Sequence, residues 1–226
     1  LPISNMATMT DAVHAHGALA GVELWYGGQR TGNVLSREVS LAPESLLAET
    51  VPWQSQRMDL TDIRNLRDWH RSAALRAKRA EFDVVYVYAG HTYLLSQFLD
   101  ANINSRTDDY GGSFRNRTRL VKEVLADTRE AVGDRCAIAI RIEVVDEDGV
   151  GRDARAEFLA EIADMVDVFD VTIPDYSQEM GASRFIKEAS LEEHVSHVRA
   201  MTGKPVVTVG RFTSPETMLS QVRRGV

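Results

Sequence analysis

The stretch that decides the fold is residues 116–142, which read NRTRLVKEVLADTREAVGDRCAIAIRI. Its first part, 116–132, carries apolar residues at helical spacing, and Gly133 follows where a helix is expected to stop. The run 136–142 is too short for a typical helix and too continuously apolar for a strand with one face in water. The stretch therefore predicts a helix followed by a strand buried on both faces, as in a parallel sheet.

The same alternation of helix-like and strand-like stretches runs along the rest of the chain. Four more apolar runs lie at 18–26, 82–88, 168–173 and 205–209, and further stretches with helical spacing lie at 61–80, 154–166 and 191–201. Successive units of this kind form right-handed crossovers into a parallel sheet. The order predicts an α/β fold in which a helix precedes five strands and each strand is followed by a helix.

Two architectures fit this order, an open doubly wound sheet and a (β/α) barrel. The segments after the first two strands, 27–60 and 89–115, are long, and long loops at the carboxyl ends of strands favour the barrel. A closed barrel of this type has eight strands, however, and only five are expected here, so both architectures remain open at this point. In the helix at 61–80, Trp69 is expected on the buried face and His70 on the surface.

Composition and charge exclude several classes of protein. Lys and Arg number 26 and Asp and Glu number 33, a formal net charge of −7, which argues against nucleic acid as a partner. The single cysteine, Cys136, excludes a disulfide framework, a cysteine-ligated zinc site and an iron–sulfur cluster held by this chain alone. There is neither a secretory signal pattern nor an apolar run of about 18 residues. We therefore expect a cytoplasmic protein without membrane contact.

Polar residues stand at or just after the ends of the apolar runs. They are Glu23, Tyr88, His91, Arg141, Asp175 and the pair Gly210-Arg211. The carboxyl ends of the strands form the functional face of α/β folds, and a buried charge is costly unless it is paired. The pattern predicts a site at this face. Two simpler interpretations stay open, because Glu23 and Arg141 can form a core ion pair and His91 can be an ordinary loop histidine.

One long motif points to a family. Residues 104–117 read NSRTDDYGGSFRNR and resemble the N-x-R-x-D-x-Y-G-G-S-x-x-N-R stretch of the old yellow enzyme superfamily, whose members are flavin-dependent (β/α)8 barrels. We expect the arginines and aspartate of this motif to brace a long loop. The motif identifies the family more than it identifies the chemistry.

Within that superfamily the chain looks most like the trimethylamine, dimethylamine and histamine dehydrogenases. The resemblance rests on GALAGVELWYGG at 17–28 and YVYAGHTY at 86–93, and it continues through FDVTI at 169–173, SRF at 183–185 and VGRF at 209–212. Ene reductases of the superfamily usually carry His-x-x-Asn or His-x-x-His at the end of the second strand seen here. This sequence has Tyr88-x-x-His91 instead, the form of the amine dehydrogenases.

The resemblance implies an FMN site and an amine substrate. Residues 1–226 would be the central part of an FMN-binding barrel, about strands 3 to 7, truncated at both ends. Glu23 resembles the residue that bonds the pyrimidine edge of the flavin, Arg141 the arginine beside N1 and C2=O, and Gly210 and Arg211 the phosphate loop. Tyr88 and His91 resemble two members of a Tyr-His-Asp group. A small amine would lose a hydride equivalent to FMN, and water would then release an aldehyde and a smaller amine or ammonia.

The segment after the fourth strand departs from the family pattern. Residues 175–181, DYSQEMG, are fewer than in trimethylamine dehydrogenase and lack the matching tryptophan. Asp175 or Glu179 is expected to supply the acid, and Tyr93 and Tyr176 are expected to contact substrate. Because an aromatic bowl binds methylated ammonium by cation–π attraction, its loss favours a larger or primary amine, as in histamine dehydrogenase.

The resemblance also implies a longer protein. The flavin-linked cysteine, the iron–sulfur ligands and the nucleotide-binding domains would lie outside this segment, which holds no metal itself. We expect the complete protein to be a homodimer that passes electrons to an acceptor protein. Two alternatives remain. One is an NAD(P)H-dependent ene or dienoyl-CoA reductase, against which Tyr88 argues, and the other is a non-catalytic barrel fragment with two open sheet edges.

Overall fold

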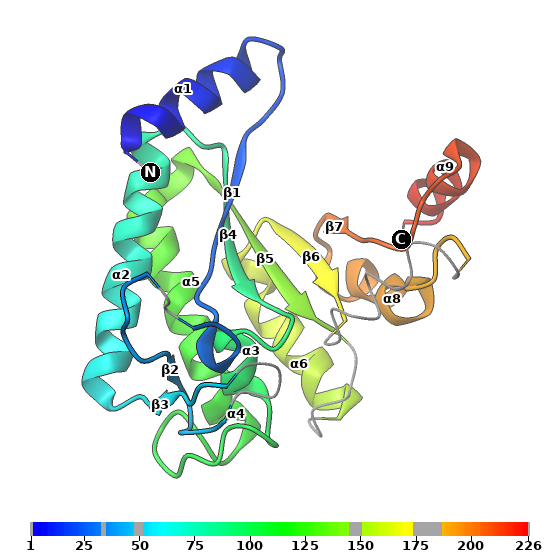
Figure 1. Cartoon of the computed structure of the whole chain (residues 1–226). Helices are drawn as coiled ribbons and strands as arrows, with labels where there is room; N and C mark the ends of the chain where they lie inside the picture. Colours follow the sequence, from blue (N-terminus) through cyan, green and yellow to red (C-terminus); the bar gives the residue numbers. More distant parts are fainter. Residues whose placement is uncertain (1, 33–34, 48–51, 145–150, 174–186, 226) are drawn as a thin grey trace.

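The protein is built around one parallel sheet (Figure 1). The computed structural model describes residues 2–32, 35–47, 52–144, 151–173 and 187–225. The strands lie in the order β1-β4-β5-β6-β7, and every neighbouring pair is parallel. Their bounds are β1 Gly21–Leu24, β4 Val84–Ala89, β5 Ala137–Glu143, β6 Val168–Thr172 and β7 Val206–Val207. The predicted α/β fold with five parallel strands is confirmed.

Helices cover one side of this sheet. Figure 1 shows α2, α5 and α6 together on the same side of the strands. The helices are α1 Ile3–His14, α2 Leu60–Arg79, α3 Leu94–Leu99, α4 Phe114–Arg117, α5 Arg119–Val132, α6 Arg152–Ile162, α8 Glu192–Thr202 and α9 Pro215–Arg224. A doubly wound sheet carries helices on both faces, so this arrangement matches the wall of a barrel.

Short elements fill the long loop at the carboxyl end of β1, the first strand of the sheet. They are the 3-10 turn η1 Gly28–Arg30 and a small parallel pair, β2 Leu41–Ala42 and β3 Gln56–Arg57. Two further 3-10 turns, η2 Gly133–Arg135 and η3 Ala163–Met165, lead into β5 and β6. The long loops therefore lie at one end of the sheet and the short connections at the other, as the sequence predicted.

The first and last strands are shorter and more exposed than predicted. The run 18–26 forms a strand only over β1, and the run 205–209 only over β7. Alternate residues of β1 are exposed, because this strand lies at one edge of the described sheet and β7 lies at the other. Burial on both faces holds for the three inner strands, whose side chains are nearly all buried or half-buried. The predicted helix 116–132 is divided at Thr118 into α4 and α5.

The buried face of α2 differs from the prediction by one position. Its buried residues are Ile63, Leu66, Ala74 and Ala77, whereas 52% of Trp69 is exposed. His70 instead takes the inward place between Leu66 and Ala74, since spacings of four residues keep one helix face. The Nε2 atom of His70 is buried without a hydrogen-bond partner among the described residues, and burial lowers the pKa of the ring to about 4.

The 104–117 motif braces the loops below the sheet. The Arg106 guanidinium donates to the carbonyl oxygen of Met58 at 2.6 Å and binds the Asp108 carboxylate at 2.5 Å. Arg117 donates to the carbonyl oxygens of Leu99 and Gly112 at 2.7 and 2.5 Å. The predicted structural role of these arginines and the aspartate is confirmed. The bonds to Met58 and Leu99 join segments far apart in the chain, while those to Asp108 and Gly112 fix the motif itself, so the motif holds the frame on which the strand-end loops rest.

Candidate active site

The predicted polar residues meet at the carboxyl end of the sheet. In the strand register Tyr88 of β4 pairs with Arg141 of β5, and Arg141 pairs with Asp170 of β6. Side chains that share a register level in a parallel sheet point to the same face. The structure thus brings Tyr88 and Arg141, two of the residues predicted from the sequence, to one level of the sheet, with Asp170 beside them.

Arg141 is the centre of this cluster. Its Nη1 atom lies 3.2 Å from Glu23 Oε1, and its guanidinium carbon lies 5.5 Å from the centre of the Tyr88 ring. Burial lowers the pKa of the guanidinium, but the charges of Asp170, Tyr88 and Glu23 outweigh that effect, and the net shift is upward. The Glu23–Arg141 ion pair considered from the sequence is present. Both side chains keep exposed area, 39% and 21%, so the pair remains accessible from the site.

A buried chain of hydrogen bonds lies beside the arginine. The Tyr88 hydroxyl lies 2.5 Å from His91 Nδ1, and the Thr172 hydroxyl lies 3.0 Å from His91 Nε2. His91 is 2% exposed and Thr172 is 0% exposed. Both ring nitrogens of His91 are therefore engaged, and the histidine is no ordinary loop residue. Thr172 was not singled out from the sequence. It is a polar residue at the end of an apolar strand, and that position could have marked it as a site residue.

The backbone at His91 is strained and held from three sides. His91 and Thr92 both have φ of 55°, the left-handed region, which costs a non-glycine residue about 1–3 kcal/mol. Glu143 Oε1 accepts the Thr92 N–H at 2.8 Å, Arg30 donates to the His91 carbonyl at 3.0 Å, and Gln97 donates to the Thr92 carbonyl at 2.6 Å. Strain of this kind persists only where the surroundings fix it, and it gathers at functional sites.

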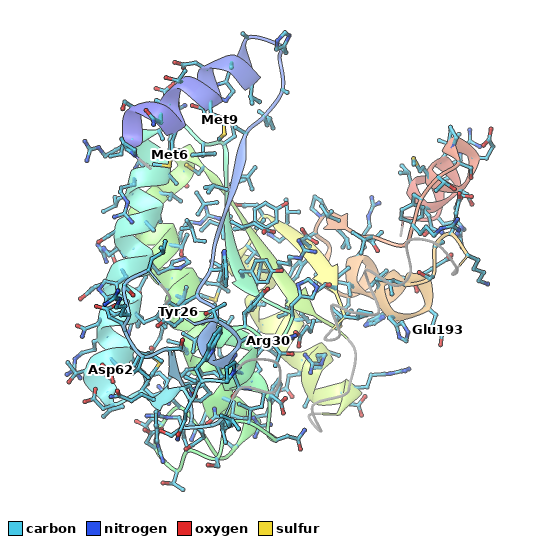
Figure 2. All side chains as sticks on the ribbon, viewed as in Figure 1. Met6, Met9, Tyr26, Arg30, Asp62 and Glu193 are labelled. Carbon is cyan, nitrogen blue, oxygen red and sulfur yellow. The ribbon has the colours of Figure 1, made fainter. Side chains whose placement is uncertain are left out.

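The loop after β1 meets the loop after β4 at this point. Figure 2 labels Tyr26 and Arg30 in the loop that follows β1, where Arg30 is the last residue of η1. The carbonyl oxygen of Tyr26 accepts the Leu94 N–H at 3.0 Å, and Arg30 reaches the His91 carbonyl. The two long loops therefore support each other, and the position of His91 depends on both.

Aromatic rings line the approach to Tyr88. The Tyr93 ring centre lies 5.5 Å from that of Tyr88 and 4.8 Å from that of Trp25. A cavity of about 390 Å³ is lined by Glu23, Trp25 and Tyr88 and, from the α2 side, by residues that include Trp69 and His70; Tyr93 is not part of its lining. Tyr93, which the sequence predicted as a substrate contact, thus lies beside the Tyr88 and Trp25 rings. Trp25 was missed as a site residue because the apolar run around it predicted a buried strand.

Gly210 and Arg211 lie after the last described strand. The Gly210 carbonyl accepts the Ala189 N–H at 2.7 Å, and a Cβ added to Gly210 would lie 3.1 Å from Ala189 Cα. Only glycine allows this close approach of two backbone segments. The hydroxyl oxygen of Ser190, in the same turn, is buried and has no hydrogen-bond partner among the described residues. The turn therefore offers an unused polar group at a strand end.

Three predicted residues, Asp175, Tyr176 and Glu179, lie outside the described residues. Two other absences concern the described part of the chain alone. It contains no group of three or more His, Cys, Asp or Glu side chains that could hold a metal ion. None of its helices is long and apolar enough to cross a bilayer.

The parallel sheet, its one-sided helices and its polar, aromatic rim define part of a barrel enzyme. Residues 2–226 match the NADH:flavin oxidoreductase / NADH oxidase family, and the chain belongs to that family. The resemblance to the old yellow enzyme superfamily is thereby confirmed. Morphinone reductase, 24% identical with a TM-score of 0.78 over 99% of this chain, shares the fold.

More similar relatives carry names of amine-converting enzymes. Dimethylamine dehydrogenase of Hyphomicrobium sp. (strain x) is 36% identical over 98% of this chain and 32% of its own length. The structure of 6-hydroxypseudooxynicotine amine oxidase from Pseudomonas geniculata N1 is 44% identical with a TM-score of 0.92. Histamine dehydrogenase from Rhizobium sp. 4-9 is 40% identical with a TM-score of 0.91. Each of these two structures matches 99% of this chain over 34% of its own, so the chain spans about a third of these relatives.

Proposed function

We propose that this chain is the substrate- and flavin-binding part of an FMN-dependent oxidoreductase that oxidises a small amine. The observation that carries the proposal is the Tyr88–His91 hydrogen bond of 2.5 Å, placed directly beside the Arg141 cation. This pair can move a proton at the edge of a cavity lined by aromatic rings. Similarity to dimethylamine and histamine dehydrogenases supports the choice of an amine.

The residues present fit FMN. Arg141 and Glu23 lie together at the strand ends. The guanidinium can donate hydrogen bonds to the acceptor atoms of a flavin pyrimidine, and the carboxylate can accept from its N–H group. The segment 189–190 packs against Gly210 and brings the buried Ser190 hydroxyl, which has no partner among the described residues, to a strand end, where barrel folds bind phosphate. Glu23 and Arg141 would hold the ring, and Gly210 and Arg211 the phosphate. When bound, FMN accepts the hydride equivalent that the amine loses.

The side chains of the chain itself handle the proton of the amine. An ammonium group has no lone pair, so a proton must leave before its carbon can release a hydride. Tyr88 is one of the residues that line the cavity, and its hydroxyl bonds His91 Nδ1, so a proton taken up at the tyrosine oxygen can be passed to the histidine. The rings of Tyr93 and Trp25 would contact the carbon skeleton of the substrate. Because His91 is buried, bulk water does not reach the nitrogen that would receive this proton.

We also propose that the complete protein passes its electrons through an iron–sulfur cluster to an acceptor protein and is a homodimer. The cluster would use cysteines outside these residues. Cys136 is 2% exposed, its Sγ atom lies 3.1 Å from the Phe82 carbonyl oxygen, and burial raises the pKa of its thiol. Such a thiol packs a strand and is a poor metal ligand.

An anaerobic reduction experiment tests the proposal. The intact protein, loaded with FMN, is mixed separately with histamine, dimethylamine and NADPH, and the flavin absorbance is followed. We expect an amine to bleach the flavin and NADPH to leave it oxidised. Bleaching by NADPH alone would contradict the proposal and favour a reductase. A protein that retains no flavin after loading would support a non-catalytic fragment instead.

A further inference from the structure

The ends of two neighbouring strands hold two successive residues of the His91 loop. Glu143 of β5 and Thr172 of β6 face each other in the strand register. Glu143 Oε1 accepts the Thr92 N–H at 2.8 Å, and Thr172 Oγ1 lies 3.0 Å from His91 Nε2. One strand therefore fixes the backbone of the loop, while the other contacts the imidazole ring.

We propose that Thr172 is a positioning residue that keeps the proton of His91 on Nε2, so that Nδ1 is the nitrogen that exchanges a proton with Tyr88. A neutral imidazole has one donor and one acceptor nitrogen, and the group bonded to one nitrogen decides the state of the other. With Thr172 Oγ1 accepting from Nε2–H, the Tyr88 hydroxyl donates to Nδ1 across 2.5 Å.

A neutral hydroxyl suits this task. Nε2 carries a hydrogen in this tautomer and in the imidazolium, so its bond to Thr172 persists while Nδ1 gains or loses a proton. A carboxylate in the same place would add a negative charge and favour the imidazolium throughout. Thr172 is 0% exposed and His91 is 2% exposed, so bulk water has no access to replace this bond. The side chain of Thr172 therefore acts on Tyr88 through His91.

Nitrogen NMR of the intact protein with ¹⁵N-labelled histidine tests this assignment. The signals of His91 are identified by their loss in His91→Gln. In the unsubstituted protein we expect Nε2 to show a bonded hydrogen and Nδ1 to have the shift of an unprotonated ring nitrogen. A hydrogen on Nδ1 in the neutral ring would overturn the proposal without any variant. The measurement does not depend on which substrate the enzyme oxidises.

Three variants separate positioning from packing. Thr172→Val keeps the shape and removes the hydroxyl, and we expect the two His91 nitrogen shifts to move toward each other as the tautomers mix. Thr172→Ser restores the hydroxyl and should restore both shifts. Thr128→Val is the matched control, because Thr128 is also 0% exposed and its hydroxyl bonds the Val124 carbonyl within α5. Unchanged His91 shifts in Thr172→Val, or equal changes in Thr128→Val, would overturn the proposal.

Discussion

The Arg141 guanidinium carbon lies 5.5 Å from the centre of the Tyr88 ring, while its Nη1 atom contacts Glu23 at 3.2 Å. One cation thus joins the two parts of the candidate site, the residues proposed to hold the flavin and the pair proposed to move a proton. A positive charge over the tyrosine ring favours any negative charge that develops on its oxygen. Changes at Arg141 should therefore affect both flavin binding and proton transfer.

The substitution Arg141→Lys should weaken flavin binding about 5- to 30-fold, a loss of about one to two kcal/mol. Lysine keeps the charge but lacks the planar fork that can bond a flavin edge and stack on Tyr88. Flavin fluorescence during titration of the apoprotein measures the change. Arg71→Lys is the control, because Arg71 pairs with Glu130 on the outer helices. Unchanged flavin affinity in Arg141→Lys would contradict the assignment.

The substitution Tyr88→Phe should slow the reduction of the flavin by amine about 100- to 10,000-fold, the usual contribution of a positioned acid or base. The ring remains, but His91 Nδ1 loses its partner at 2.5 Å. Stopped-flow absorbance at several pH values measures the rate. Tyr110→Phe removes a hydroxyl that bonds Glu123 at 2.9 Å and should leave the rate unchanged. Equal losses in both variants would indicate a general structural effect.

The substitution Glu143→Ala should lower the free energy of unfolding by about 1–3 kcal/mol, because the Thr92 N–H loses its acceptor in a strained turn. Urea unfolding measures the loss, and hydrogen exchange of the Thr92 amide locates it. Glu143→Gln keeps an oxygen that can accept the bond and should lose less. Glu161→Ala, at an exposed pair with Lys122, is the surface control. A Gln variant as unstable as the Ala variant would contradict this account.

His70 makes stability depend on pH. Burial lowers the pKa of its ring to about 4, below the ordinary value of 6.5. As the pH falls between these values, the unfolded chain binds a proton that the folded chain does not, so stability falls, by about 3 kcal/mol. His70→Leu should remove this loss, whereas His16→Gln, at an exposed residue, should keep it. Urea unfolding at pH 7 and pH 4 compares them, and a parallel decline in all three proteins would refute the prediction.

Local patterns predicted most of the fold. The apolar run at 136–142 becomes β5, and the order of strands follows from right-handed crossovers. Asp59 caps α2 by accepting the Thr61 and Asp62 N–H groups, as such residues do wherever a helix begins. The position of His70 was wrong because the period of α2 was assigned to Trp69, and a shift of one residue turns a side chain by more than a quarter of the helix circumference.

The site could be predicted only in part. Tyr88 and His91 are three residues apart, so sequence places them together. Thr172 lies 81 residues beyond His91, and their contact depends on the register of β4 and β6 on the two sides of β5. Register of this kind is a property of the whole sheet. The sequence predicted that each strand ends in polar residues. Which side chains contact one another could be seen only in the structure.

The loop brace described for Arg106 and Arg117 has a consequence for how such a protein can change. Besides the Asp108 carboxylate, which Arg106 binds, the two guanidinium groups hold main-chain carbonyl oxygens at Met58, Leu99 and Gly112. Every residue type offers the same carbonyl oxygen, so substitutions at Met58 or Leu99 leave these attachment points in place. The hydrogen bonds that hold the loops under the site therefore do not depend on which side chains stand at these positions. A substrate cavity can be remodelled above it, by chance or by design, without dismantling what holds Tyr88 and His91 in position.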